Sequence, residues 1–125
     1  KAVEDKIPVI IFSKGSHEKI NDLKKIGGDV YGVDSSIFIS QFWDDLGGEF
    51  AVQGNLNPDL MSTTPGIVKE ETHKILNEFG ERNGLIFNLG HGIKPDGKIE
   101  CMQALVETVV NFNKNSQSIE PTLQQ

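Results

Sequence analysis

The sequence alternates short apolar runs with amphipathic segments four times, and this alternation constrains the fold more than any other feature. Apolar runs at residues 8–12, 29–33, 50–53 and 85–88 predict strands. Because these runs are almost wholly apolar, we expect the strands, the first included, to be buried on both faces. Each run is followed by apolar residues at helical spacing, within about 16–26, 37–46, 64–79 and 100–112. Strands that alternate with helices favour a parallel sheet, because each helix carries the chain back to the start of the next strand.

Local signals indicate where these elements begin and end. Ser16 predicts the N-cap of the first helix, and Thr64 followed by Pro65 predicts the start of the third. Glycines directly after each of the first three helices predict their ends. From residue 113 the sequence becomes polar. We therefore expect residues 1–112 to form the folded part and residues 113–125 to form a mobile tail.

Two architectures accommodate four strand–helix units in 125 residues. The first is half of a (β/α)₈ barrel, which typically has about 250 residues. The second is a small flavodoxin-like sheet. Both place their ligands at the carboxyl ends of the strands, so both direct attention to the same residues.

Charge and cysteine content exclude several classes of function. The net charge is −6, with no basic surface of the kind that binds nucleic acid or an anionic membrane. The apolar run 9–12 is too short to span a membrane. A single cysteine, Cys101, permits no internal disulfide and no thiol cluster for a metal, which favours a reducing, cytoplasmic setting. Because residue 1 is Lys1 rather than methionine, we expect the chain to be cut from a longer one.

Polar side chains are predicted at the carboxyl ends of the strands. In a parallel sheet these ends meet at one edge, so residues from distant parts of the sequence are brought together there. The residues concerned are Lys14, Asp34, Gln53, Asn55, Asn88 and His91.

His91 is the most informative of these residues. It lies between Gly90 and Gly92, directly after an apolar strand, so its imidazole is presented with little crowding from its neighbours. Such a group can donate a hydrogen bond to a carboxylate or transfer a proton near neutral pH. It can equally be a turn histidine bonded to a nearby carbonyl, and the pattern alone does not decide between the two.

The other polar residues favour structural roles. Gln53 and Asn55 flank a glycine and are typical of a turn stabilised by side-chain amides. Lys14 can attract an acidic ligand, but we favour an ion pair between Lys14 and Asp34 of the adjacent strand. Two further histidines are expected on solvated helical faces among charged residues, namely His17 and His73.

Several segments together resemble the uroporphyrinogen decarboxylase family. They are residues 8–15, 29–34, 52–58 and 86–96, continued by 104–107, and their order and spacing fit the carboxy-terminal part of that family. The resemblance covers about residues 7–112. Its most specific element is the glycine–histidine–glycine motif around His91, followed by Pro95 and Asp96.

The resemblance implies the carboxy-terminal half of a (β/α)₈ barrel, about four βα units with parallel strands. It implies a carboxy-lyase of haem biosynthesis, which converts uroporphyrinogen to coproporphyrinogen by removing carbon dioxide from four acetate side chains. It implies no metal or organic cofactor, and a homodimer of the whole enzyme in the cytoplasm.

Residue by residue, the resemblance assigns one substrate-binding position, His91, which would donate a hydrogen bond to a substrate carboxylate. It assigns no catalytic residue to this chain. The family's arginines and its central aspartate have no counterpart here, because the only arginine is Arg82 and Asp34 matches a different motif. We therefore expect the 125-residue chain alone to be inactive.

Two alternatives remain beside this interpretation. The related corrinoid-linked methyltransferases bind zinc through a histidine and cysteines, but this sequence has Ser13, Lys14 and His91 near the expected ligand positions. The other alternative is a stand-alone half barrel without decarboxylase activity. Its two open sheet edges would lead it to associate with itself.

Overall fold

The computed structural model describes residues 7–118 and divides them into two compact units. In the described part of the chain, the first unit comprises residues 7–58 and Phe79–Gly92, and it contains the sheet. The second comprises Asp59–Glu78 and residues 93–118, and it is mainly helical.

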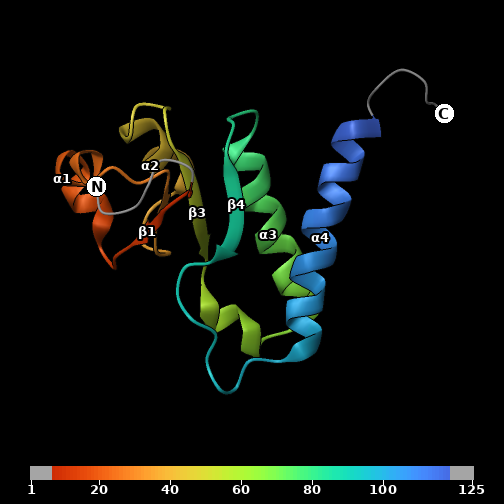
Figure 1. The fold of residues 1–125 in the computed structure, drawn as a ribbon. Coiled ribbons are helices and arrows are strands. Elements are labelled where there is room, and N and C mark those ends of the chain that lie inside the picture. Colours follow the sequence, from red (N-terminus) through yellow and green to blue (C-terminus); the bar gives the residue numbers. More distant parts are fainter. Residues whose placement is uncertain (1–6, 119–125) are drawn as a thin grey trace. The chain divides into compact units, whose positions relative to one another are not determined.

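Four parallel strands form one sheet in the order in which they occur in the chain (Figure 1). They are β1 (Ile10–Phe12), β2 (Val30–Gly32), β3 (Ala51–Leu56) and β4 (Leu85–Leu89). A flavodoxin-like sheet reverses its strand order at a switch point, whereas a (β/α)₈ barrel adds each strand beside the previous one. The order β1-β2-β3-β4 therefore confirms the barrel architecture, of which this chain contains four βα units.

The helical segments of the first unit follow β1 and β2. A 3₁₀ helix, η1 (Ser16–Lys19), leads into α1 (Ile20–Ile26), and α2 (Ile39–Asp45) follows the second strand. The predicted N-cap role of Ser16 is wrong. The residue lies one turn too early, and its buried hydroxyl donates to the Gly32 carbonyl oxygen at 3.3 Å.

The core of the first unit is centred on Tyr31 of β2. This side chain is fully buried, and its hydroxyl donates to the Leu23 carbonyl oxygen at 2.7 Å and accepts from the Gly28 amide at 3.0 Å. The ring also contacts that of Phe50 edge to face, with centroids 5.1 Å apart. A buried tyrosine needs such partners, because an unpaired hydroxyl in the core is costly.

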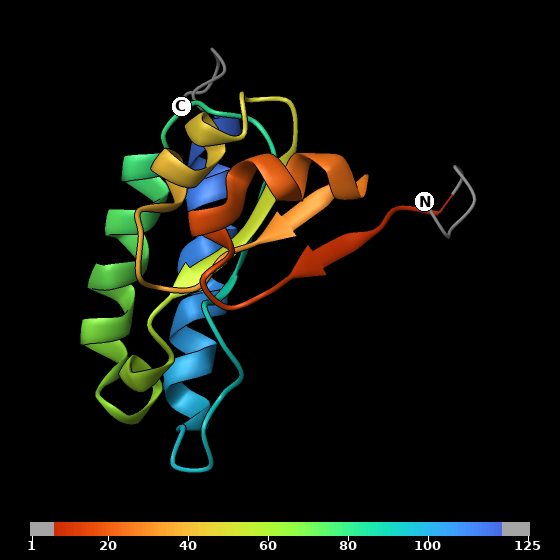
Figure 2. The same cartoon turned by 90° about the vertical axis from the view of Figure 1, so that its left-hand side faces the viewer.

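The prediction that the first strand is buried on both faces is wrong. Ile10 and Phe12 are 51% and 46% exposed. Figure 2 shows β1 and β2 side by side, pointing the same way. Among the described residues, β2 is the only strand that pairs with β1, so β1 is an edge strand. Its sequence is nevertheless as apolar as that of a strand with neighbours on both sides.

The second unit consists of the 3₁₀ helix η2 (Pro58–Ser62), which starts at its boundary, and of two long helices. The first, α3 (Pro65–Phe79), begins as predicted, because the Thr64 hydroxyl accepts from the Ile67 amide at 3.3 Å and Pro65 is the first helical residue. The second, α4 (Ile99–Ser118), ends six residues later than predicted. The helix continues past residue 112 because neither glycine nor proline occurs between residues 113 and 118. Residues 119–125 of the predicted tail lie outside the described residues.

The two long helices run side by side in the same direction (Figures 1 and 2). The His73 ring on α3 contacts the Phe112 ring on α4, with centroids 6.4 Å apart. The loop before α4 is fixed to the segment before α3. There the Lys98 amide donates to the Met61 carbonyl oxygen at 2.8 Å, and Lys94 forms an ion pair with Asp59.

Candidate functional site at the carboxyl ends of the strands

Asp34, directly after β2, holds two loops together. One carboxylate oxygen accepts from the Gly15 amide at 2.8 Å, in the loop after β1. The other accepts from the Ser36 amide at 3.0 Å and from the Ser36 hydroxyl. The predicted ion pair with Lys14 is wrong. Within residues 7–118 Lys14 makes no ion pair with Asp34, whose donors are backbone amides and a hydroxyl instead.

These donors determine the charge state of Asp34. Burial alone would raise the pKa of the carboxyl group, but the hydrogen bonds from Ser36 and Gly15, together with the nearby His17, outweigh burial and lower it. A lowered pKa in the folded state means that the ionised carboxylate stabilises the fold. That contribution is fully present above the ordinary value of 3.8, and it is lost as the pH falls through the lower folded value.

We expect Asp34→Asn to lower the free energy of unfolding by about 1–3 kcal/mol at pH 7, because two part-buried backbone amides lose a charged acceptor. The wild-type protein should lose part of this advantage as the pH falls below 3.8, so the two stability curves converge there. Urea unfolding at a series of pH values measures both effects. Asp22→Asn on the exposed surface of α1 controls for the loss of one negative charge. Parallel curves for wild type and Asp34→Asn would contradict this prediction.

Asn55 and Asn88 have structural roles. The Asn55 side chain is buried, and its amide group donates to the carbonyl oxygens of Asp34 at 2.8 Å and Ile37 at 2.6 Å. The Asn88 side-chain oxygen accepts from the Leu89 amide at 2.7 Å. The predicted turn around Gln53 and Asn55 is wrong, because β3 continues to Leu56. For the same reason Gln53 lies within the strand rather than at its end. The Asn55 amide instead holds the chain that follows β2.

His91 follows β4 and is exposed. The preceding residue, Gly90, is buried and extends the ladder by donating from its amide to the Leu56 carbonyl oxygen at 2.7 Å. A Cβ atom on Gly90 would lie 2.7 Å from the Ser35 amide nitrogen, so the backbones after β4 and after β2 are in close contact. The chain after β4 therefore crosses the end of β3, and His91 is presented over the carboxyl ends of the strands.

The remaining histidines are less exposed than predicted. His17 on η1 and His73 on α3 are both half-buried rather than solvated. The Nδ1 atom of His17 is buried without a hydrogen-bond partner, and the His73 ring packs against Phe112. The amphipathic pattern alone did not reveal the contact of His73, because Phe112 is far from it in the sequence.

Arg82 lies at the opposite end of the sheet from His91, three residues before β4. Its guanidinium makes two hydrogen bonds to the Asp44 carboxylate, both at 3.1 Å, and lowers the pKa of that group. It also donates to the Phe79 carbonyl oxygen at 3.0 Å and lies 5.8 Å from the Trp43 ring centroid. The only arginine of the chain is therefore used in a structural contact, far from the carboxyl ends of the strands.

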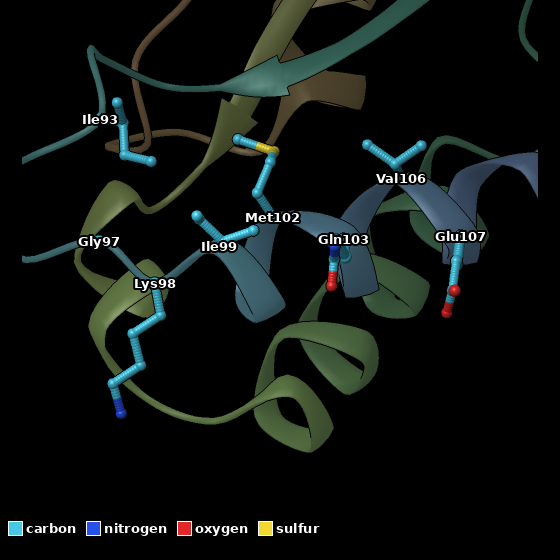
Figure 3. Close-up of a pocket in the computed structure, with 8 residues that line it drawn as sticks. All are labelled: Ile93, Gly97, Lys98, Ile99, Met102, Gln103, Val106 and Glu107. Atoms are coloured by element: carbon cyan, nitrogen blue, oxygen red, sulfur yellow. The ribbon is translucent and has the colours of Figure 1, made fainter.

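The second unit contains a groove of about 610 Å³ whose lining is largely apolar, unlike the polar carboxyl ends of the strands (Figure 3). Its walls include Ile93, Ile99 and Met102, whose side chains gather together, while the Lys98 side chain extends away from them. Ile99 is 76% exposed. An apolar lining of this kind does not fit a ligand with several carboxylates.

Neither a metal site nor a membrane span is present in the described part of the chain. No group of three metal-ligating side chains occurs within residues 7–118, and Cys101 is buried. No helix over the same range is long and apolar enough to cross a membrane.

The consecutive parallel strands, with polar side chains at their carboxyl ends, define this chain as part of a (β/α)₈-barrel protein. Residues 1–112 match the family model described as uroporphyrinogen decarboxylase (URO-D). The chain belongs to the uroporphyrinogen decarboxylase family.

Individual relatives agree with this assignment. The chain is 37% identical over 114 residues to a uroporphyrinogen decarboxylase from Vesicomyosocius okutanii, covering 91% of this chain and 33% of that one. It is 41% identical over 106 residues to a uroporphyrinogen decarboxylase from Solibacter usitatus, covering 85% and 31%. The chain thus spans about a third of the length of these relatives.

Among solved structures, a methyltransferase from Methanosarcina mazei is similar, with a TM-score of 0.70 and 19% sequence identity. The likeness covers 85% of this chain and 32% of that one. At this identity it concerns the fold alone, which agrees with the barrel architecture.

Proposed function

We propose that this chain is the carboxy-terminal part of a uroporphyrinogen decarboxylase, a cytoplasmic carboxy-lyase of haem biosynthesis. The whole enzyme would convert uroporphyrinogen to coproporphyrinogen by removing carbon dioxide from four acetate side chains. It would act as a homodimer without a cofactor, a nucleic-acid partner or a membrane. The match of residues 1–112 to the family model carries this proposal.

His91 is the substrate-binding residue of the proposal. Its exposure at the carboxyl ends of the strands supports this role, because ligands of barrel enzymes bind there. An imidazole N–H that donates to a carboxylate forms a charge-assisted hydrogen bond, which is stronger than one between neutral groups. The glycines on both sides of His91 leave room for a large substrate to approach it.

The 125-residue chain alone is expected to be inactive. A substrate with many carboxylates needs several cationic partners, and the single arginine is held by Asp44 at the other end of the sheet. The remaining cationic groups must come from a longer polypeptide. Coverage of about a third of the relatives supports this expectation.

The test is the conversion of uroporphyrinogen to coproporphyrinogen by the polypeptide at its natural length. We expect His91→Asn to lower kcat/KM about 10- to 100-fold while the fold is retained. The shorter asparagine side chain does not place its N–H where the imidazole N–H would lie, so the hydrogen bond to a charged group is lost. Unchanged kcat/KM would contradict the role of His91. Turnover by the isolated 125-residue chain would contradict its expected inactivity.

The self-associating half barrel remains the alternative. The outer edges of β1 and β4, which pair with no further strand among residues 7–118, favour it. The length of the polypeptide in the cell separates the two. A product about three times as long as this chain supports the decarboxylase. A product of 125 residues that sediments as a dimer or larger supports the alternative.

A further inference from the structure

The ring of Phe12, the last residue of β1, contacts the ring of His91 edge to face. The centroids are 6.4 Å apart, and the ring planes are inclined by 81°. β1 and β4 are the outer strands of the described sheet, and in a flat sheet they would lie about 14 Å apart. The contact is therefore made across β2 and β3, at the place where the chain after β4 turns back over the strand ends.

Gly32 makes this contact possible. Phe12 pairs in register with Gly32 of β2, and a Cβ atom on Gly32 would lie 2.9 Å from Phe12 Cδ1 and 3.2 Å from its Cβ. The Phe12 side chain thus packs directly against the backbone of Gly32, which has no side chain of its own. A larger residue at position 32 would push the ring away from the strand.

The Phe12 ring is not an ordinary core side chain, since the residue is 46% exposed. Nor does the chain beside His91 hold its imidazole in place, because both neighbours are glycines and nothing lies within 4 Å of a Cβ atom built on Gly92. Within residues 7–118, Phe12 is the aromatic partner of His91. An edge-to-face contact has a preferred geometry, so it restricts the orientation of the imidazole.

We propose that Phe12 is a positioning residue, which holds the His91 imidazole in the orientation that binds a substrate carboxylate. The proposal rests on the function proposed above for His91. It adds a residue that the sequence pattern assigned to a buried strand. Phe12 acts through His91, so removal of its ring should weaken substrate binding without removing the hydrogen-bond donor.

The kinetic test uses the polypeptide at its natural length with uroporphyrinogen as substrate. We expect Phe12→Leu to raise KM about threefold to tenfold with little change in kcat, the range that corresponds to one aromatic pair. Phe12→Tyr keeps the ring and should restore KM to within about twofold of wild type. Phe38→Leu is the matched control, because Phe38 is 72% exposed and forms no ring contact within the described residues.

The spectroscopic test needs no substrate. At this ring distance we expect the Phe12 ring current to shift the NMR signals of the His91 ring protons. The shift should be lost in Phe12→Leu and kept in Phe12→Tyr. Gly32→Ala is a second, independent variant. It keeps both rings but moves Phe12 away, so it should lose the shift and raise KM as Phe12→Leu does.

Combination with His91→Asn shows whether Phe12 acts through His91. Phe12→Leu should add no further loss in that background. A Phe12→Leu protein with wild-type KM overturns the proposal, and so does a loss that persists in the double variant. If His91→Asn leaves kcat/KM unchanged, the role proposed for His91 has failed. Unshifted His91 signals in Phe12→Leu would then overturn the positioning contact as well, whereas their movement would support the contact alone.

Discussion

Gly54→Ala is expected to destabilise the protein by about 3–5 kcal/mol, the largest effect of any single substitution considered for this chain. Gly54 lies inside β3 with a φ of +147°, a conformation that residues with a side chain rarely adopt. A Cβ atom there would also lie 2.6 Å from the Val33 carbonyl oxygen. This oxygen belongs to the backbone and cannot rotate away, so backbone strain and steric overlap add to each other.

Urea unfolding of the polypeptide at its natural length measures this loss as a lower midpoint. Gly66→Ala is the matched control, because Gly66 lies in the first turn of α3 and nothing lies within 4 Å of its Cβ position. Alanine has a higher helix propensity than glycine, so the control should be stabilised by up to about 1 kcal/mol. Equal midpoints for wild type and Gly54→Ala would show that β3 accommodates a side chain at this position.

Gly90→Ala is expected to cost about 1–3 kcal/mol of stability and to lower kcat/KM about 100-fold. The new Cβ atom would lie 2.7 Å from the Ser35 amide nitrogen and 3.1 Å from the Asp34 carbonyl carbon. Either the chain after β4 or the chain after β2 must then move. Since His91 is the next residue, even a displacement of about 1 Å would take its imidazole away from the substrate.

Gly92→Ala is the control for Gly90→Ala. It tests whether the losses come from the close contact between Gly90 and the chain after β2, or whether any side chain next to His91 would cause them. Nothing lies within 4 Å of a Cβ atom on Gly92, so we expect its stability to stay within about 0.5 kcal/mol of wild type. Steady-state kinetics and urea unfolding of the two alanine variants together make the comparison. Similar losses of stability in both would refute the close contact between Gly90 and the chain after β2.

Most of the fold could be predicted because each strand and helix has its own local pattern. Thr64 with Pro65, and the glycines after the helices, marked the element ends with little dependence on the rest of the chain. The exposure of β1 could not be predicted in this way. Its apolar residues suit a strand with neighbours on both sides, and the pattern does not say whether both neighbours are within these 125 residues.

The candidate site could be predicted only as a set of residues at one edge of the sheet. The sequence indicated that Asp34 and His91 lie there, but not that Asp34 binds backbone amides rather than Lys14. Phe12 was missed because an aromatic residue in an apolar run indicates a core position. One signal could have identified it, namely that its partner in register, Gly32, leaves space for its ring.

The consecutive strand order also has a consequence for synthesis on the ribosome. Each strand pairs with the strand that immediately precedes it in the chain, as in Ile10 with Val30, Val30 with Ala51 and Val52 with Leu85. At about 5–20 residues per second, each new strand emerges within seconds of its partner. The sheet can therefore grow by one strand–helix unit at a time during translation, without waiting for a distant segment of the chain.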